Sequence, residues 1–277
     1  FYNKIKNMKS KTLVLTVNFK NHNPTRDLIA SIEKCENSES VFVVIIDNES
    51  TKKSYNELNK IVINSSLKTL IVPFKKNYFY WPAVKKSLAE LKEKKAKWTI
   101  VCNNDILIDD VNFFNKLYSL DSKTYHVIGA KIIDEKNKNL NPFMLKPMSK
   151  FRLFYWNLFF KSYYLSIFLK FFKNFKNFKS NHKNQKTQEV YAIHGSAMIF
   201  SKYFFDNGGW LDDNFKLFCE ELSTAEISKK IGCKIFYIPY LMIKHNSHTA
   251  LKKLSNKELY NYAKSSHFYF INKYIKK

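Results

Sequence analysis

Residues 12 to 19 read TLVLTVNF, a short apolar run rich in β-branched side chains, and a helical pattern follows from Pro24 through Leu28, Ile29, Ile32 and Cys35. Apolar side chains at these spacings predict a strand followed by a helix. The alternation recurs as far as residue 102, with strands predicted at 41–46, 68–73 and 98–102 and helices at 52–61 and 83–94. Continuous apolar strands that alternate with helices indicate a parallel sheet covered on both faces. We therefore expect an α/β fold.

Polar side chains gather where these predicted strands end. In a sheet of this kind, ligands bind at the carboxyl ends of the strands. The candidates at these ends are Asn18, Asp47-Asn48-Glu49-Ser50, Asn77 and Asn103-Asn104-Asp105.

The second half of the chain breaks the alternation. Strands are predicted at 125–133, 190–200 and 234–238, with a loop containing Pro142 and Pro147 after the first of them and a surface connection at 179–188. Gly208-Gly209 predicts a turn, and a helix predicted from Glu221 to Lys230 ends at Gly232, a common helix C-cap.

Residues 151–178 are unusually aromatic and basic. Interruptions by Arg152, Lys161, Lys170 and Lys173 leave no run near the ~20 apolar residues that cross a bilayer. Bulky apolar residues with interspersed lysines suit an interfacial helix attracted to anionic lipid. The same pattern also suits a helical pair whose aromatic residues pack on the sheet or on a second subunit, and both interpretations stay open.

The composition limits the class of protein. Hydrophobic residues make up 45% of the 277 residues, which predicts a folded domain rather than a disordered chain. The net charge of +24 could attract nucleic acid or an anionic membrane, but lysine is spread along the chain, which is more typical of a solvated surface. Nucleic acid is therefore an unexpected partner.

The cysteines and the N-terminus bear on the compartment. Cys35, Cys102, Cys219 and Cys233 lie far apart without a C-x-x-C pair, which favours a reducing, cytoplasmic setting over a disulfide framework or a zinc site. The first twelve residues are basic and polar and do not resemble a signal peptide, although a lost N-terminal region stays open.

Three side chains are candidates for chemistry. Asp105 follows a buried strand and could ligate Mg²⁺ or Mn²⁺, which prefer oxygen ligands, although an Asp there is also a common turn or helix N-cap residue. His245, with His248 as an alternative, follows strand 234–238 and could complete such a site. Glu221, with Glu220 beside it, could act as a general base or simply supply an acidic first helical turn.

Taken together, these residues resemble the family 2 glycosyltransferases, particularly the rhamnosyltransferase-like bacterial members that build surface polysaccharides. The resemblance runs from about Leu13 to His248. Thr16-Val17-Asn18 resembles the motif that ends the family's first strand, Ile46-Asp47-Asn48-Glu49-Ser50 resembles its V-D-N-x-S motif, and Asn103-Asn104-Asp105 stands at its D-x-D position. The resemblance implies that Asp47 binds the nucleotide base and that the other donor-binding residues are Thr16, Asn18, Asn48, Asn77, Asn103 and Asn104.

The second half continues the resemblance in order. Gly195-Ser196-Ala197-Met198 is similar to the acceptor-side G-x-x-M segment, and Gly209-Trp210-Leu211-Asp212-Asp213 is similar to the G-x-F-D-E turn. Glu220-Glu221 falls where the family usually has Glu-Asp, and His245 falls at its metal-binding histidine. The resemblance thus implies Glu221 or Glu220 as catalytic base, Asp105 and His245 as metal ligands, and Gly195, Trp210 and Asp212 on the acceptor side.

Three departures from the family pattern affect these expectations. Asn103 replaces the first acid of D-x-D, and Glu221 replaces an Asp, which lengthens the side chain of the base by one methylene. A run of bulky residues, Tyr78-Phe79-Tyr80-Trp81-Pro82, replaces the glycine-rich loop expected after Asn77 and could reshape the donor pocket.

The resemblance implies a GT-A fold, which is a Rossmann-like mixed sheet with flanking helices, here with an aromatic and basic helical insertion at about 148–182. The predicted boundaries are an N-terminal extension at 1–11, the transferase domain at 12–250 and a C-terminal helical segment at 251–277. It further implies an inverting transfer from a nucleotide-diphospho-sugar to a glycan or lipid-linked hydroxyl in capsule or O-antigen synthesis, with Mn²⁺ or Mg²⁺. The expected setting is the cytoplasm, with peripheral attachment to the inner face of the cytoplasmic membrane and a homodimer left open.

Two other functions fit parts of the sequence less well. A nucleotide- or nucleic-acid-binding module without transferase activity would explain the basic charge, but the aromatic residues do not form a recognisable stacking motif. A sugar nucleotidyltransferase should carry a glycine-rich and basic loop after its first strand, and Asn18-Phe19-Lys20-Asn21-His22 contains no glycine.

Overall fold

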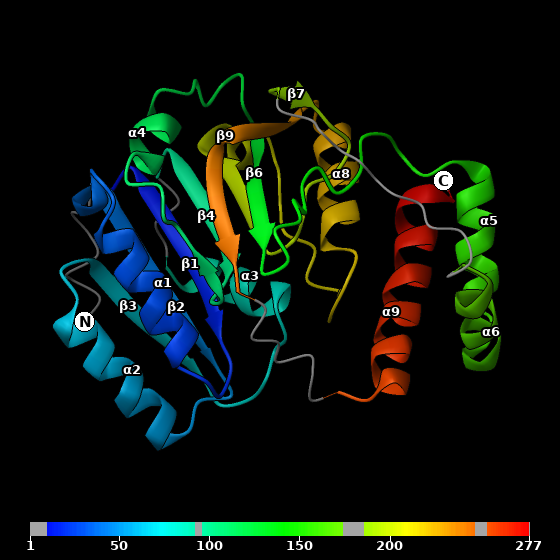
Figure 1. The fold of residues 1–277 in the computed structure, drawn as a ribbon, viewed down its shortest axis with the longest axis horizontal. Helices are drawn as coiled ribbons and strands as arrows, with labels where there is room; N and C mark the ends of the chain where they lie inside the picture. The colour runs from blue at the N-terminus through cyan, green and yellow to red at the C-terminus, as the bar shows by residue number, and fades with distance from the viewer. Residues whose placement is uncertain (1–9, 92–95, 174–185, 247–253, 277) are drawn as a thin grey trace.

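The computed structural model describes residues 10–91, 96–173, 186–246 and 254–276. Its centre is a mixed sheet with the strand order β3-β2-β1-β4-β8-β6-β9-β5, and β7 pairs with β9 (Figure 1). Four strands at one side of the sheet are parallel: β3 (Lys68–Phe74), β2 (Val41–Asn48), β1 (Thr12–Asn18) and β4 (Trp98–Asn103). The parallel sheet predicted from the first hundred residues is therefore confirmed.

The other half of the sheet changes direction. Strand β8 (Ala197–Ser201) runs antiparallel to both β4 and β6 (Val127–Asp134). Strand β9 (Ile235–His245) runs parallel to β6 and antiparallel to the short strands β5 (Ile106–Leu107) and β7 (Gln188–Glu189). Reversals of this kind make the sheet mixed, as expected from the family resemblance.

Two predicted strands were wrong in their extent. Residues 190–196 are not part of a strand, apart from an isolated bridge between Ala192 and Met144, because the chain there turns to bring Gly195 toward a helix end. The last strand continues past Pro239 to His245, whereas the sequence predicted that it ends at 238. A register shift in the β6–β9 pairing accommodates the proline, which cannot donate a ladder hydrogen bond.

Helices cover both faces of the sheet. Helices α1 (Asn23–Glu33), α2 (Lys52–Asn64) and α4 (Phe113–Tyr118) bury their apolar sides in one core cluster. Helices α3 (Trp81–Glu90), α7 (Lys202–Asp206) and α8 (Glu220–Lys230) contribute to a second cluster on the opposite face. Continuous apolar strands such as β2, which is buried along its whole length, are therefore shielded on both sides.

A helical layer stands beside the sheet. Helices α5 (Lys150–Phe159) and α6 (Tyr163–Lys173) pack against the C-terminal helix α9 (Asn256–Phe270), which a short π-helical segment, Ile271–Ile275, continues (Figure 1). Residues 174–185 of the predicted insertion, and most of the predicted N-terminal extension, lie outside the described residues. Among the described residues, none of the helices is long and apolar enough to cross a membrane.

Candidate active site

The ends of β1, β2 and β4 lie side by side, which brings the predicted donor-binding residues together. In the register of the sheet, Asn18 pairs with Asp47, and Val17 pairs with Asn103. The Asn18 amide donates to Asp47 Oδ1 over 2.9 Å, and its oxygen accepts from Thr25 Oγ1 over 3.0 Å. Asn18, Asp47 and Asn103 thus lie next to one another at one edge of the sheet.

Asp47 is buried, and its carboxylate is already engaged. Oδ1 accepts from Asn18, Ser50 Oγ donates to Oδ2, and Ser54 Oγ lies 3.2 Å from Oδ1. These bonds fix the chain where it leaves β2. The contact with a nucleotide base expected of Asp47 stays a prediction, as does the donor contact expected of Thr16, which is buried within β1.

Asn48 and Asn77 shape the loop that follows β3. The Asn48 amide nitrogen donates to Asn77 Oδ1 over 2.8 Å and to the carbonyl of Phe79 over 2.7 Å, while its oxygen accepts from the backbone N–H of Tyr78 over 2.8 Å. Phe79 adopts a positive φ of 64°. The asparagine pair therefore holds a tight turn built from bulky residues, where the family resemblance led us to expect glycine.

Asn104 joins the same edge from the loop after β4. Its amide nitrogen donates to Thr25 Oγ1 over 3.0 Å and lies 3.4 Å from Asn18 Oδ1. The backbone N–H of Asn103 donates to the carbonyl of Ser196 over 2.9 Å, which connects this edge to the loop before β8.

Asp105 and His245 meet at the end of the sheet because β5 pairs with β9. Asp105 lies directly before β5, His245 is the last residue of β9, and the backbone N–H of Asn246 donates to the carbonyl of Asp105 over 2.8 Å. Asp105 Oδ1 lies 3.1 Å from His245 Nε2, and both side chains are buried. This contact is an ion pair by distance but not a hydrogen bond, and Oδ1 and both imidazole nitrogens are buried polar atoms without a hydrogen-bond partner.

These buried polar atoms fit a divalent cation. Unsatisfied buried nitrogen and oxygen atoms are costly, and a cation would satisfy one of each here. Neighbouring ligands of an octahedral ion such as Mg²⁺ lie roughly 3 Å apart, which matches the 3.1 Å between Oδ1 and Nε2. In the described part of the chain no group of three or more His, Cys, Asp or Glu could hold a metal. The protein thus offers two ligands, and His248, the alternative to His245, lies outside the described residues.

His194 is a site residue that sequence reasoning missed, because it lies inside the apolar run that was assigned to a strand. Its ring lies 6.2 Å from the ring of His245, measured between centroids. The backbone N–H of Ser196 donates to His194 Nδ1 over 3.2 Å, and a backbone N–H can only donate. Nε2 therefore carries the proton of the neutral ring. Burial, with the nearby charge of His245, lowers the pKa of His194 to about 4.

The two glutamates open α8 on the other side of this loop. The backbone N–H of Gly195 donates to Glu221 Oε1 over 3.1 Å, which holds one carboxylate oxygen in place. Burial, with the nearby Glu221 carboxylate, raises the pKa of Glu220 to about 8, and burial also raises the pKa of Glu221. Neighbouring carboxylates with raised pKa values are typical of proton-transfer sites.

Tyr80, at the start of α3, contacts the loop that carries Gly195. Its hydroxyl donates to the carbonyl of Gly195 over 3.2 Å. Burial raises the pKa of Tyr80 well above its ordinary value, and Cys102, Glu220, Asp105 and Glu221 add smaller contributions in the same direction. Its hydrogen bond thus ties Tyr80 to the loop that holds Glu221 through Gly195.

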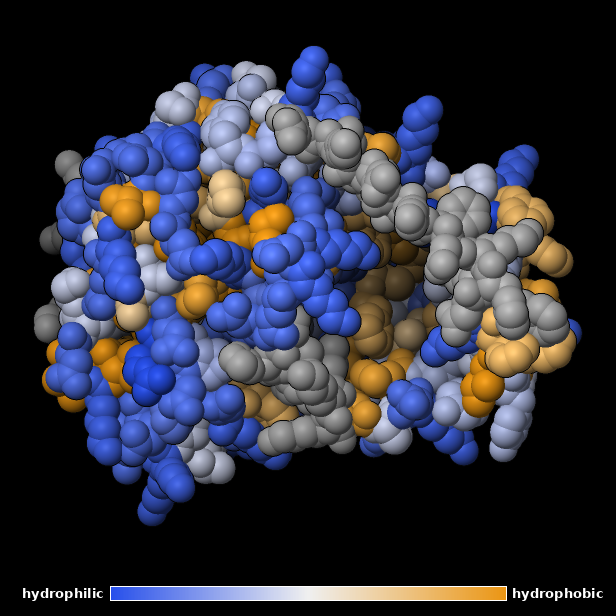
Figure 2. All heavy atoms as spheres, viewed as in Figure 1, coloured by the Kyte–Doolittle hydropathy of each residue, from blue (hydrophilic) through white to orange (hydrophobic). Residues whose placement is uncertain are grey.

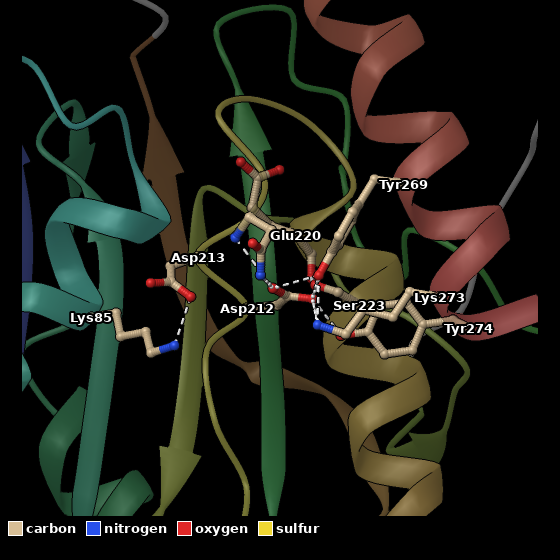
Figure 3. A network of polar contacts seen from close by, with 9 residues as sticks. Lys85, Asp212, Asp213, Glu220, Ser223, Tyr269, Lys273 and Tyr274 are labelled. Atoms are coloured by element: carbon tan, nitrogen blue, oxygen red, sulfur yellow. Dashed lines mark hydrogen bonds and ion pairs between the residues drawn. The ribbon is translucent and has the colours of Figure 1, made fainter.

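Two predicted acceptor-side residues, Trp210 and Asp212, contact parts of the fold other than the Asp105–His245 pair. Trp210 packs under Lys230, whose Nζ lies 5.6 Å from its ring centroid, at the end of α8 opposite to Glu221. Asp212 is fully buried and anchors the C-terminal segment: Tyr274 Oη donates to its carboxylate over 2.6 Å, Lys273 Nζ over 3.0 Å and Tyr269 Oη over 3.2 Å (Figure 3). An acceptor role for either residue stays a prediction.

The sequence matches no protein-family model and no curated protein. Solved structures do resemble the fold. A mannosyltransferase from Pyrobaculum calidifontis in complex with GDP-Man and Mn²⁺ matches 86% of this chain at 12% identity with a TM-score of 0.55. GalNAc-T7 with UDP, GalNAc and Mn²⁺ matches 87% at 14% identity with a TM-score of 0.58. S. aureus TarS residues 1–349, in complex with UDP-GlcNAc, matches 88% at 12% identity with a TM-score of 0.57.

The chain has the GT-A glycosyltransferase fold. It spans 57% of the matched mannosyltransferase chain, 44% of the GalNAc-T7 chain and 61% of the TarS chain. At 12–14% identity these similarities concern the fold alone.

Within this GT-A fold, most residues predicted from the sequence converge. The polar ends of β1, β2 and β4, the Asp105–His245 pair and the Gly195–Glu221 contact are joined through the loop at 194–196 and through Tyr80. The convergence follows from the strand order, which sets β4 between β1 and β8.

Proposed function

We propose that this chain transfers a sugar from a nucleotide-diphospho-sugar to a hydroxyl group of an acceptor, with inversion at the anomeric carbon. The observation that carries the proposal is the buried Asp105–His245 pair, with its unpartnered ligand atoms, beside two carboxylates of raised pKa. The GT-A fold supports it, because matched structures with this fold hold GDP-Man and UDP-GlcNAc.

The nucleotide would lie over the carboxyl ends of β1, β2 and β4. Asn18, Asn48 and Asn104 line this edge, and Asn103 and Asn77 flank it. Hydrogen bonds fix the side chains of the first three: Asn18 donates to Asp47, Asn48 to Asn77 and Asn104 to Thr25. Asp47 would hold Asn18 in place at this pocket, since its carboxylate accepts hydrogen bonds from Asn18 and from two serines. These side chains and the bulky loop after Asn77 would determine which nucleotide base the pocket accepts.

Asp105 and His245 would hold a divalent cation, Mn²⁺ or Mg²⁺. Such an ion neutralises the charge that develops on a departing diphosphate. With two protein ligands in reach, its remaining positions are free for donor phosphate oxygens and water, which is how hard cations are usually shared with nucleotide substrates.

His194 would contribute a neutral hydrogen-bond donor beside this pair. Because Nδ1 accepts from Ser196, Nε2–H can donate to an oxygen of the donor substrate without adding charge to the site. Its low pKa keeps the ring neutral near pH 7.

Glu221 would take the proton of the acceptor hydroxyl. Gly195 N–H fixes Oε1, which leaves Oε2 for the proton. As the acceptor oxygen forms its bond to the anomeric carbon, the bond from that carbon to the phosphate oxygen breaks, and the nucleoside diphosphate leaves with the electron pair. Glu220 is the second candidate for the base, since it shares the same helix end.

The finer parts of the proposal are membership of glycosyltransferase family 2 and a role in bacterial surface polysaccharide synthesis. The ordered motifs from Thr16 to His245 support both. A lipid-linked acceptor, a cytoplasmic location and a homodimer belong to the same set of proposals.

A two-stage experiment tests the function. UDP, dTDP and GDP are screened for thermal stabilisation of the chain with and without Mn²⁺, and the matching nucleotide sugars are then assayed for nucleotide release. We expect Mn²⁺-dependent stabilisation by at least one nucleotide, retained in Glu221→Gln while turnover falls by ~10³-fold or more. Full turnover in Glu221→Gln and in Asp105→Ala would refute the assignment of the site.

A further inference from the structure

The helices α5 and α6 present one side to α9 and another to solvent. On the inner side, Phe159 and Phe160 are buried against Tyr260, and Asn157 Oδ1 lies 2.8 Å from His267 Nε2. This packing accounts for part of the aromatic content that the sequence shows between 151 and 178.

The outer side of the pair is also apolar. Phe151 and Phe154 on α5 are 80% and 65% exposed, and Tyr164 and Ile167 on α6 are 79% and 49% exposed. Each pair has the i, i+3 spacing of neighbours on one helix face. Phe168 and Phe171, at 58% and 62% exposure, lie on the α6 face at i+4 and i+7 from Tyr164. We call Phe151, Phe154, Tyr164 and Ile167 the aromatic face.

This arrangement reverses the usual pattern of a surface helix, which turns polar residues outward. Large exposed side chains gathered on one surface mark an interaction site, whereas single exposed apolar residues need no explanation. Figure 2 shows hydrophobic atoms gathered at the end of the molecule where Figure 1 places α5 and α6.

The charged residues of α5, α6 and the turn between them are all positive. Between Lys136 and Gln188 the sequence contains no Asp or Glu. The helices carry Lys150, Arg152 and Lys170, and Lys161 lies in the turn between them. A second copy of the chain docked through the same face would bring like charges together, because a two-fold interface joins identical patches. An anionic lipid surface would instead complement the lysines while its acyl boundary buries the aromatic side chains.

We propose that the aromatic face of α5 and α6 docks on an anionic lipid bilayer surface. The proposal does not depend on sugar transfer, since it rests on exposure and charge alone. Docking would place the helical layer against the membrane, and the GT-A sheet would stand beside it.

Vesicle co-sedimentation of the intact chain tests the proposal. The probes are vesicles of phosphatidylcholine alone and of an equal mixture with phosphatidylglycerol, at about 0.1 M and 0.5 M salt, which differ strongly in electrostatic screening. We expect binding to the anionic vesicles that weakens at high salt, and at least tenfold weaker binding to the neutral ones.

Two variants and a matched control locate the contact. Phe151→Asp with Tyr164→Asp should weaken anionic-vesicle binding at least tenfold, because two bulky side chains no longer enter the interface. Ile63→Asp changes an equally exposed residue, at 80%, on α2 at the far side of the sheet and should leave binding unchanged. Arg152→Gln with Lys161→Gln should weaken binding several-fold and reduce its salt dependence.

Four outcomes would overturn the proposal. They are no binding of the wild-type chain to anionic vesicles, equal binding to neutral vesicles, unchanged binding by both double variants, and an equal loss in Ile63→Asp. Sedimentation velocity adds a further one. A wild-type dimer that Phe151→Asp with Tyr164→Asp dissociates, without vesicle binding, would assign the aromatic face to a second copy. The thermal melt of each variant verifies that it is folded.

Discussion

Gly195 offers the sharpest test of the catalytic assignment, because a methyl group at this position would meet the proposed base directly. A Cβ built on Gly195 lies 2.8 Å from Glu221 Oε1, and its other near contacts are on the same side chain. The φ angle of Gly195 lies outside the left-handed region, so alanine brings no backbone strain. Gly195→Ala therefore acts on Glu221 and on little else.

The size of the effect follows from the distance. Ordinary contact begins near 3.4 Å, so the carboxylate must retreat by about 0.6 Å from its 2.8 Å approach. The hydrogen bond from Gly195 N–H to Oε1, now 3.1 Å, lengthens or breaks. Displacements near 1 Å can cost ~10²-fold in rate, so we expect kcat to fall roughly 10- to 100-fold, or about 1.4–2.7 kcal/mol of transition-state stabilisation. The free energy of unfolding should change by less than ~1 kcal/mol, because a flexible side chain end can yield.

Gly208 provides the matched control. It adopts a φ of +83° in open space, so alanine there strains the backbone by ~1–2 kcal/mol and touches nothing near the site. Gly208→Ala should lower the Tm by several degrees and leave kcat unchanged. The assay is steady-state nucleotide release with the best donor, together with a thermal melt of each variant.

A double-mutant cycle shows whether the alanine acts through the base. If it does, Gly195→Ala should add almost nothing in the Glu221→Gln background, because the group it displaces is already inactive. Wild-type activity in Gly195→Ala, or a full additional loss in the Glu221→Gln background, would refute the role given to the Gly195–Glu221 contact.

Three further predictions concern the metal pair, the paired carboxylates and the C-terminal anchor. Asp105→Asn should weaken Mn²⁺ affinity at least tenfold by calorimetry, because it removes the charged oxygen of a two-ligand site; unchanged affinity would place the ion elsewhere. Because burial raises the folded-state pKa of Glu220 to about 8, its contribution to stability is lost as pH rises from about 4.5 through 8. Glu220→Gln should therefore raise the free energy of unfolding more at pH 8.5 than at pH 5, with a difference on the order of 2 kcal/mol. It should also shift the rise of kcat/KM to lower pH, and a pH-independent change in stability would contradict this. Lys273→Met should cost ~1–3 kcal/mol in denaturant unfolding, since it removes a partner of buried Asp212, whereas Lys85→Met, which breaks an exposed pair with Asp213, should cost no more than ~0.5 kcal/mol; equal losses would argue against the anchor.

The sequence predicted the site best where residues lie at strand ends. Apolar β-branched runs mark β1, β2 and β4 unambiguously, and the residue after such a run must emerge at an edge of the sheet. Asn18, Asp47 and Asp105 could therefore be placed together without coordinates. His194 could not, because an apolar run on both sides of it predicts a strand, and the turn that carries it depends on a hydrogen bond from its backbone N–H to Asn141 Oδ1 over 2.7 Å.

Residues that depend on distant partners were beyond the sequence. Asp212 matches a family motif, but its carboxylate is bound by side chains 61 and 62 residues later in the chain, and no local pattern indicates that contact. Trp210 lies in the same motif, yet it packs under Lys230 at the far end of α8. The spacing of a motif gives the order of its residues along the chain. Tertiary packing determines which partners each side chain contacts.

The alternation of strands and helices by itself determined the parallel half of the sheet, because that pattern reflects burial on both faces, a local property of each segment. Only the tertiary structure decided the other half, where parallel and antiparallel pairs mix, since β5, β8 and β9 are placed by pairing with strands far away in the chain. That pairing sets Asp105 against His245 and the Gly195 loop against Glu221. The residue types of the candidate site could thus be identified from the sequence. Their geometry depends on contacts between segments that are far apart in the chain.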